Sequence, residues 1–305
     1  MKVFEAKRDF AAGSERPRLP PTLFAHIETY GNRARHSEFS TTIDSAERFM
    51  IDAILALVHT CNTEILHMRT VAISINKGGQ GKTTTVKTLA TAAVAAGHNV
   101  LILDVDTQQN SVGWRKRRDK LHQDRPLPLA RFCGEKDLLE QIKQADKAGC
   151  DLLLIDTPPG KSSEAMAAVE ASELVIIPFW NDQDSYEGVA MTAVMTRRLG
   201  KKAVGLLNFA TPNSKSHEDA AREVLKVVGL PMAPVVLHRY DLHRLANIRG
   251  LTAQEMEPSS VAALESESLW QWFCAHVQMG NGANVPASTS AILQFPEKES
   301  HDESE

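Results

Sequence analysis

The chain has 305 residues, of which 43 % are hydrophobic, so it can bury the core of one large domain or two small ones. Its formal net charge is −4, and residues 286–305, with five acids and one lysine, carry an equal excess of acids. Global charge therefore does not indicate a nucleic-acid-binding protein, and any such surface has to be a local patch. The apolar run 49–58 falls short of the ~20 residues of a membrane span, and no secretory signal is expected. The four cysteines form no C-x-x-C pair, which argues against a metal cage and fits a reducing cytoplasm.

Three zones are predicted along the chain. Residues 1–67 form an N-terminal extension, loosely ordered at first, followed by one helix over 44–68 that its apolar spacing predicts. An alternative, equally open, is that Met68 is the true start and the extension is not translated. Residues 68–280 form the main domain. Residues 281–305 begin with Asn-Gly-Ala-Asn and end acidic, a composition typical of a disordered tail.

Short apolar strands alternate with helical stretches throughout the main domain. Several strands are continuous runs of Val, Ile and Leu, as expected where both faces are buried. The alternation predicts an α/β fold with a mainly parallel twisted sheet and helices on both faces. Ligands in such folds bind at the carboxyl ends of the strands. The predicted strands are 70–76, 99–104, 127–132, 151–156, 174–179, 203–208 and 233–237.

The first motif, residues 77–84, stands between the first predicted strand and a helix predicted over 83–96, and reads Lys-Gly-Gly-Gln-Gly-Lys-Thr-Thr. Its glycines allow a tight turn whose N–H groups, with the helix N-terminus, hold phosphate oxygens. Lys82 has the reach to contact β- and γ-phosphates, and the Thr83 hydroxyl is placed to bind Mg²⁺. A glycine-rich turn that merely precedes a lysine is disfavoured, because the motif has a strand before it and a helix after it. The motif predicts an ATP–Mg²⁺ site.

Two further motifs place carboxylates at strand ends. Asp104 and Asp106 follow an apolar strand and, being two residues apart, share one face of it. From spacing alone, an aspartate that caps the next helix is an equal alternative. Asp156 follows four apolar residues in the Walker B form, which suits a carboxylate that holds the water ligands of Mg²⁺.

Together, these motifs resemble the ParA/MinD superfamily of deviant Walker A ATPases, a match that extends roughly over residues 69–277. The resemblance implies a P-loop NTPase fold, with ATP and Mg²⁺ as cofactors and weak hydrolysis of ATP to ADP and phosphate. It assigns to Lys77 a reach across an ATP-sandwiched homodimer to the partner's phosphates, and to Asp106 the orientation of the attacking water. The chain departs from the family at Asn76, where the common loop pattern has glycine, and at Thr107, where the family usually has proline.

Asn208 resembles the residue that ends a family strand near the adenine base, although a turn-forming asparagine is an equal alternative. Residues 244–255 resemble a late segment that ends the nucleotide pocket, whereas residues 179–185 lack the usual Pro-Ser-Pro. The expected catalytic residues are Lys77, Lys82 and Asp106. The residues expected to bind ATP are Lys77, Gly78, Gly79, Gln80, Gly81, Lys82, Thr83, Thr84 and Asn208. Mg²⁺ is expected on Thr83 directly, and on Asp106 and Asp156 through water.

Within the superfamily, short ParA-type partition ATPases resemble the chain best, because they often share Trp114 and a basic run after it. The acidic tail argues against the membrane helix of MinD-like relatives. This branch implies three partners: a second copy of the chain, DNA bound without sequence preference, and a ParB-like adaptor that stimulates hydrolysis. It also implies a cytoplasmic protein, associated with the nucleoid when ATP is bound. The alternative is an ATP-binding scaffold that positions a conjugation, chemotaxis or other complex without binding DNA.

Non-specific DNA binding requires Lys and Arg side chains on one face to contact phosphates. Basic helical surfaces are common in other proteins, so charge patterning alone does not identify the DNA face. A run at residues 115–120 is one candidate. The other candidates are Arg197, Arg198, Lys201 and Lys202 at a helix end, and Arg222 and Lys226 four residues apart.

Overall fold

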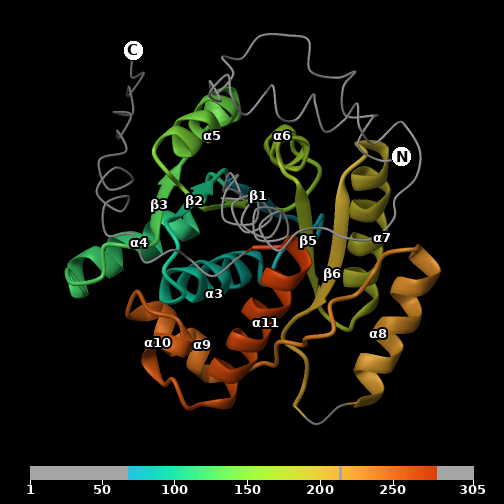
Figure 1. Ribbon diagram of the computed structural model, residues 1–305. Helices are drawn as coiled ribbons and strands as arrows, with labels where there is room; N and C mark the ends of the chain where they lie inside the picture. Colours follow the sequence, from blue (N-terminus) through green and yellow to red (C-terminus); the bar gives the residue numbers. More distant parts are fainter. Residues whose placement is uncertain (1–67, 213–214, 280–305) are drawn as a thin grey trace, which may run out of the picture. The chain divides into compact units, whose positions relative to one another are not determined.

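The computed structural model describes residues 68–212 and 215–279 (Figure 1). The helix predicted over 44–68 and the acidic tail therefore lie outside the described residues, apart from Met68. The described chain forms a sheet in the order β3-β2-β4-β1-β5-β6, and every pairing in it is parallel. The strands are β1 (Arg69–Ile73), β2 (Val100–Asp104), β3 (Leu129–Phe132), β4 (Leu152–Asp156), β5 (Leu174–Phe179) and β6 (Lys202–Leu207).

Helices cover both faces of this sheet. Alternate strand residues point to opposite faces, so Ile73 joins the core beneath α3 and α11, while its neighbour Ala72 joins the core on the other face, beside α6. This arrangement confirms the predicted fold class. The helices are α3 (Lys82–Ala95), α4 (Asn110–Leu121), α5 (Leu138–Lys147), α6 (Ser163–Ala171), α7 (Gln183–Arg198), α8 (Lys215–Val228), α9 (Asp241–Ile248), α10 (Ala253–Met256) and α11 (Val261–Val277), with a 3-10 turn η2 (Glu135–Asp137).

The central strands bring the predicted motifs together. β4 lies between β1 and β2, and its last residue, Asp156, is in register with Ile73 on one side and Asp104 on the other. The phosphate loop leaves β1 at this same edge. The carboxyl ends of three neighbouring strands therefore carry the loop and both aspartate motifs.

The strand predicted over 233–237 is wrong. This segment runs beside β6 and makes separate hydrogen bonds to it, from Ala233 N to Gly205 O at 2.8 Å and from Leu237 N to Leu207 O at 3.0 Å. It remains irregular, with only isolated bridges. Pro231 and Pro234 explain this, because proline has no N–H group to donate to a ladder. Within the described ranges, no helix combines the length and apolar character needed to cross a bilayer.

Candidate functional site

The phosphate loop is held in a conformation that glycine permits. Gly79 and Gly81 have φ angles of +77° and +82°, which residues with a side chain rarely adopt. A Cβ atom at Gly81 would lie 2.1 Å from Nδ2 of Asn208. That amide donates a hydrogen bond to Gln80 O at 3.0 Å. Asn208 thus links the end of β6 to the loop. It lies at the predicted site, and the contact that it makes there is with the loop backbone.

Gln80 ties the loop to the start of α7. Its Oε1 accepts hydrogen bonds from Trp180 N at 2.8 Å and from the Ser185 hydroxyl at 2.7 Å. The side chain of Gln80 is thereby engaged with the β5–α7 connection. Any contact of Gln80 with phosphate falls to its backbone.

Lys82, Thr83 and Asp156 meet beneath the loop. Burial lowers the pKa of Lys82, an effect that Asp156 and Asp106 oppose. Burial raises the pKa of Asp156, and the hydroxyls of Ser111 and Thr83 act against this rise. Asp156 Oδ2 accepts a hydrogen bond from Ser111 Oγ at 2.8 Å.

The second oxygen of Asp156 indicates a site for a cation. Oδ1 is buried with no hydrogen-bond partner among residues 68–212 and 215–279, a costly state for a carboxylate oxygen. Oxygen ligands such as this carboxylate and the Thr83 hydroxyl are the donors that Mg²⁺ prefers. The residues present therefore fit the predicted ion.

The two aspartates after β2 have different surroundings. Asp104 is fully buried and accepts hydrogen bonds from the backbone N–H groups of Ser111 at 2.8 Å and Val112 at 3.3 Å. Burial, aided by Asp156, raises the pKa of Asp104 to about 7. Asp104 thus supports the N-terminus of α4. The helix-capping alternative applies to Asp104, whereas the role of Asp106 stays a prediction.

Lys77 contacts its own chain. Its Nζ lies 2.6 Å from Oδ2 of Asp184 in the first turn of α7. This partner raises the pKa of Lys77, and Lys77 lowers the pKa of Asp184. Both side chains are exposed, at 43 % and 68 %. Lys77 is therefore at the surface beside the loop, where a second chain has access to it.

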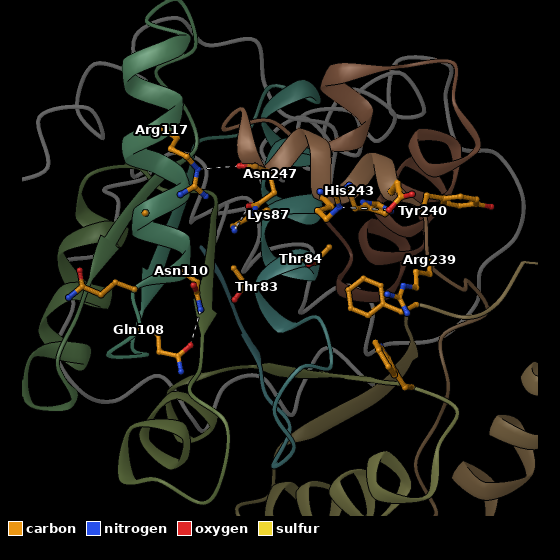
Figure 2. Close-up of a pocket in the computed structure, with 16 residues that line it drawn as sticks. Thr83, Thr84, Lys87, Gln108, Asn110, Arg117, Arg239, Tyr240, His243 and Asn247 are labelled. Carbon is orange, nitrogen blue, oxygen red and sulfur yellow. Dashed lines mark hydrogen bonds and ion pairs between the residues drawn. The ribbon is translucent and has the colours of Figure 1, made fainter.

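A cavity of about 600 Å³ opens beside the first turn of α3 (Figure 2). One side is aromatic, with Trp180 edge-to-face against Phe209 at 5.7 Å between ring centroids. The guanidinium of Arg239 lies 5.9 Å from the Trp180 centroid. The lining carries one acid, Asp241, and a larger set of cations, so it suits a polyanion with an aromatic base. These cations are Lys87, Arg117, Arg239 and Arg244.

Sequence reasoning missed this lining. No motif marks Trp180, Phe209 or Lys87, and Arg117 was expected only as part of the basic run 115–120. Their roles in the cavity depend on contacts between segments far apart in the chain. The available signal was the position of these aromatic residues just past strands that end at the site: Trp180 directly follows β5, and Phe209 is two residues past the end of β6.

The basic residues predicted as candidates for DNA binding differ in their exposure. Arg197, Arg198, Lys202, Arg222 and Lys226 are exposed. The Arg197 guanidinium donates to Val228 O at the end of α8. The end of α7 therefore lies beside the helix that carries Arg222 and Lys226, whereas Lys202 begins β6. Whether DNA binds there stays a prediction.

In the run 115–120, Arg115 and Arg118 are buried. Arg115 Nη1 donates to the carbonyls of Pro126 and Pro128 at 2.7 Å each, and Arg118 pairs with Glu255 at 2.6 Å. These two arginines support the fold, so the DNA-binding expectation for this run is wrong for them.

Comparison with known proteins identifies the family of this chain. Residues 71–251 match the CobQ/CobB/MinD/ParA nucleotide binding domain. The chain is 29 % identical over 203 residues to maintenance of carboxysome distribution protein A of Gloeobacter kilaueensis, covering 65 % of this chain and 90 % of that protein. It is 32 % identical over 149 residues to the chromosome-partitioning ATPase Soj of Thermus thermophilus, covering 40 % and 59 %.

Among solved structures, the septum site-determining protein MinD of Pyrococcus horikoshii, complexed with Mg-ADP, gives a TM-score of 0.56. The match is 20 % identical in sequence and covers 69 % of this chain and 97 % of that one. At this identity, the likeness shows the fold alone.

Proposed function

Since the chain belongs to the CobQ/CobB/MinD/ParA family of nucleotide-binding domains, we propose that it is a ParA-type ATPase switch for plasmid or chromosome partition. It binds ATP with Mg²⁺, dimerises around the nucleotide and hydrolyses it slowly to ADP and phosphate. The ATP-bound dimer binds DNA without sequence preference, and a ParB-like adaptor stimulates hydrolysis.

One observation carries the nucleotide part of this proposal. Gly81, at a position that glycine alone permits, directly precedes Lys82 and Thr83 at the start of α3. Both of these residues lie near Asp156, whose buried Oδ1 lacks a hydrogen-bond partner in the described chain. One edge of the sheet thus provides N–H groups that can donate hydrogen bonds to phosphate, the cation of Lys82, and oxygen ligands for Mg²⁺. A purely structural turn would not require the buried lysine and carboxylate beneath it.

The residues divide the chemistry among them. Mg²⁺, when bound, supplies positive charge to the β- and γ-phosphate oxygens. Lys82 donates hydrogen bonds to the same oxygens, and Asp106 orients the attacking water. Lys77 of a second copy adds positive charge to the transition state, as an arginine finger supplied in trans does.

The partition role is supported by the likeness to Soj. The likeness to the carboxysome distribution protein supports a second candidate, in which the chain positions a different cellular cargo. An ATP-dependent scaffold without DNA binding, for a conjugation or chemotaxis complex, belongs to this second class. ATP-dependent DNA binding separates the partition role from the scaffold that does not bind DNA.

The test measures binding of the full chain to random-sequence duplex DNA with ATP, with ADP and without nucleotide, over a salt series. Binding is expected only with ATP, and it should weaken steeply with salt because phosphate contacts release counterions. Lys82→Ala should abolish nucleotide binding and therefore DNA binding. DNA binding by that variant at the wild-type level would contradict the site.

A matched pair of variants tests the DNA face. Arg222→Ala with Lys226→Ala, on α8, should weaken DNA binding and reduce its salt dependence. Lys143→Ala with Lys147→Ala removes the same charge from exposed positions on α5, and should leave DNA binding unchanged. ATP binding without any DNA binding would favour the scaffold.

A further inference from the structure

The cavity has a cationic corner for which the phosphate-loop motif does not account. We propose that Lys87 and Arg117 form a second anion-binding subsite, which takes the α-phosphate of the nucleotide, the phosphate common to ATP and ADP. The inference rests on the proposed function, because it needs the phosphate loop to hold the terminal phosphates. It adds an affinity-determining contact on the part of the ligand that hydrolysis leaves unchanged.

The position of Lys87 on α3 favours this assignment. Lys87 is four residues after Thr83 and three after Thr84, so all three share one face of the helix. It lies about 6 Å further from the loop along the helix axis. Lys82 reaches the β- and γ-phosphates, and a cation one turn further on is placed for the phosphate next to the ribose. Thr83, Thr84, Lys87 and Arg117 all line the cavity (Figure 2).

No carboxylate of the described chain forms an ion pair with Lys87. The residue is 7 % exposed, and its Nζ donates to Oδ1 of Asn247, a neutral group, at 2.9 Å. Nε of Arg117 donates to the backbone oxygen of the same Asn247 at 3.2 Å. Neither cation makes an ion pair with any residue in the part of the chain described. Two cations thus converge on one neutral residue at the wall of an open cavity.

A structural role alone explains this arrangement poorly. A buried cation without a carboxylate partner is costly. The hydrogen bond to the neutral amide of Asn247 does not balance the charge of Lys87, and an apolar contact would hold the two helices together without this cost. The Trp114 ring, 5.8 Å from Nζ, offers partial compensation. An anion in the cavity would offset the cost directly.

The charged groups that face Lys87 come from several elements. Asp156 on β4 and Asp104 on β2 favour its charged form, and Arg117 on α4 disfavours it. Asp241, His243 and Arg244 on α9 line the same cavity. With burial as the largest cause, the pKa of Lys87 falls to about 8. An anion held by Lys87 raises this pKa, so the anion binds more weakly once Lys87 loses its proton.

The test is calorimetric titration of the nucleotide-free full chain with Mg-ATP and with Mg-ADP. Lys87→Met and Arg117→Met should each weaken both nucleotides by the same factor, roughly tenfold to a hundredfold for one charged hydrogen bond. Lys120→Met removes an exposed cation from the same helix as Arg117 and should bind like wild type. Thermal unfolding of each variant checks that it is folded.

A pH series separates charge from structure. Between about pH 7 and about pH 9, wild-type affinity should fall as Lys87 deprotonates, because the protonated lysine is the form that binds. Lys87→Met should lose this fall, and Lys87→Arg, charged throughout, should keep high affinity without it. A Lys87→Met variant that is folded and binds both nucleotides like wild type would overturn the subsite.

Two other outcomes are distinguishable. If wild type binds neither nucleotide, the proposed function fails before the subsite is tested. If inorganic phosphate binds wild type together with ADP, and Lys87→Met loses the phosphate but keeps its ADP affinity, the corner takes a separate anion and the α-phosphate assignment is overturned.

Discussion

Gly81 shows how one backbone position determines the site. Its φ of +82° lies in the left-handed region, and the position of a Cβ atom is already filled by the Asn208 amide and the Phe209 ring, at 2.1 and 2.7 Å. A methyl group there strains the backbone and pushes both side chains out of place. The loop and the end of β6 are therefore one structural unit.

Gly81→Ala is expected to lower the free energy of unfolding by about 1–3 kcal/mol and to weaken Mg-ADP binding by at least about tenfold. Urea unfolding and calorimetric titration measure the two effects. Gly134→Ala is the control, because Gly134 has a φ of −70° and no atom within 4 Å of its Cβ position. Equal behaviour of the two variants would contradict the close packing at Gly81.

Residue roles could be predicted from the sequence where a motif fixes the spacing. Lys82, Thr83 and Asp156 meet as expected, since the loop and the Walker B strand place them within a few residues of the sheet edge. Asp104 and Lys87 could not be assigned in the same way. Their partners, the N-terminus of α4 and Asn247 on α9, depend on how helices pack.

At the scale of elements, α4 and α10 are joined by a buried ion pair. Nη1 and Nη2 of Arg118 donate to the carboxylate of Glu255 at 3.0 and 2.6 Å, and the two side chains are 2 % and 13 % exposed. Glu255 also accepts from Thr252 N at 3.0 Å, which completes the capping box of α10. One carboxylate therefore begins a helix and neutralises a buried arginine.

Glu255→Ala is expected to lower the free energy of unfolding by about 3–5 kcal/mol, because it leaves the Arg118 charge buried without its partner. Chemical denaturation measures the loss. Glu257→Ala removes an exposed acid at the other end of α10 and should cost little. The double variant Arg118→Met with Glu255→Leu should lose less than Glu255→Ala, and a larger loss would argue against an uncompensated charge as the cause.

Strands were predictable where apolar residues run without a break. β5 has the predicted bounds 174–179, and β4 begins one residue later than predicted. The segment 233–237 misled because it is apolar and buried, as a strand would be, while prolines within and before it prevent a continuous ladder. A strand in a sheet needs both burial and continuous backbone pairing, and an apolar composition predicts chiefly the burial.

At the scale of the whole molecule, alternation of strands and helices predicted the parallel sheet, but the strand order was beyond it. β1 lies between β4 and β5, and these pairings join residues far apart in the chain, such as Arg69 with Leu152 and Val71 with Leu174. The predicted dimer also belongs to this scale. Lys77 pairs with Asp184 of its own chain, so a contact with a partner's phosphates requires that exposed and therefore weak ion pair to open.

On the proposed function, Asp106→Ala is expected to accumulate an ATP-bound dimer, because it removes the carboxylate that we propose to orient the attacking water. Sedimentation velocity with ATP and Mg²⁺ measures the dimer fraction over time. Asp146→Ala, at an exposed acid on α5, should behave like wild type. Full ATP turnover by Asp106→Ala would exclude the assigned role.

Gln80 and Lys77 attach one end of α7 to the phosphate loop. Both residues attach the phosphate loop to the first turn of this helix, through Ser185 and Asp184. The helix has 16 residues and is therefore about 24 Å long, with Arg197 and Arg198 at its far end. A rotation of about 10° about the attached end would move those arginines by roughly 4 Å, from the same length. A displacement of this size is comparable to the rise of about 3.4 Å per base pair along a DNA duplex.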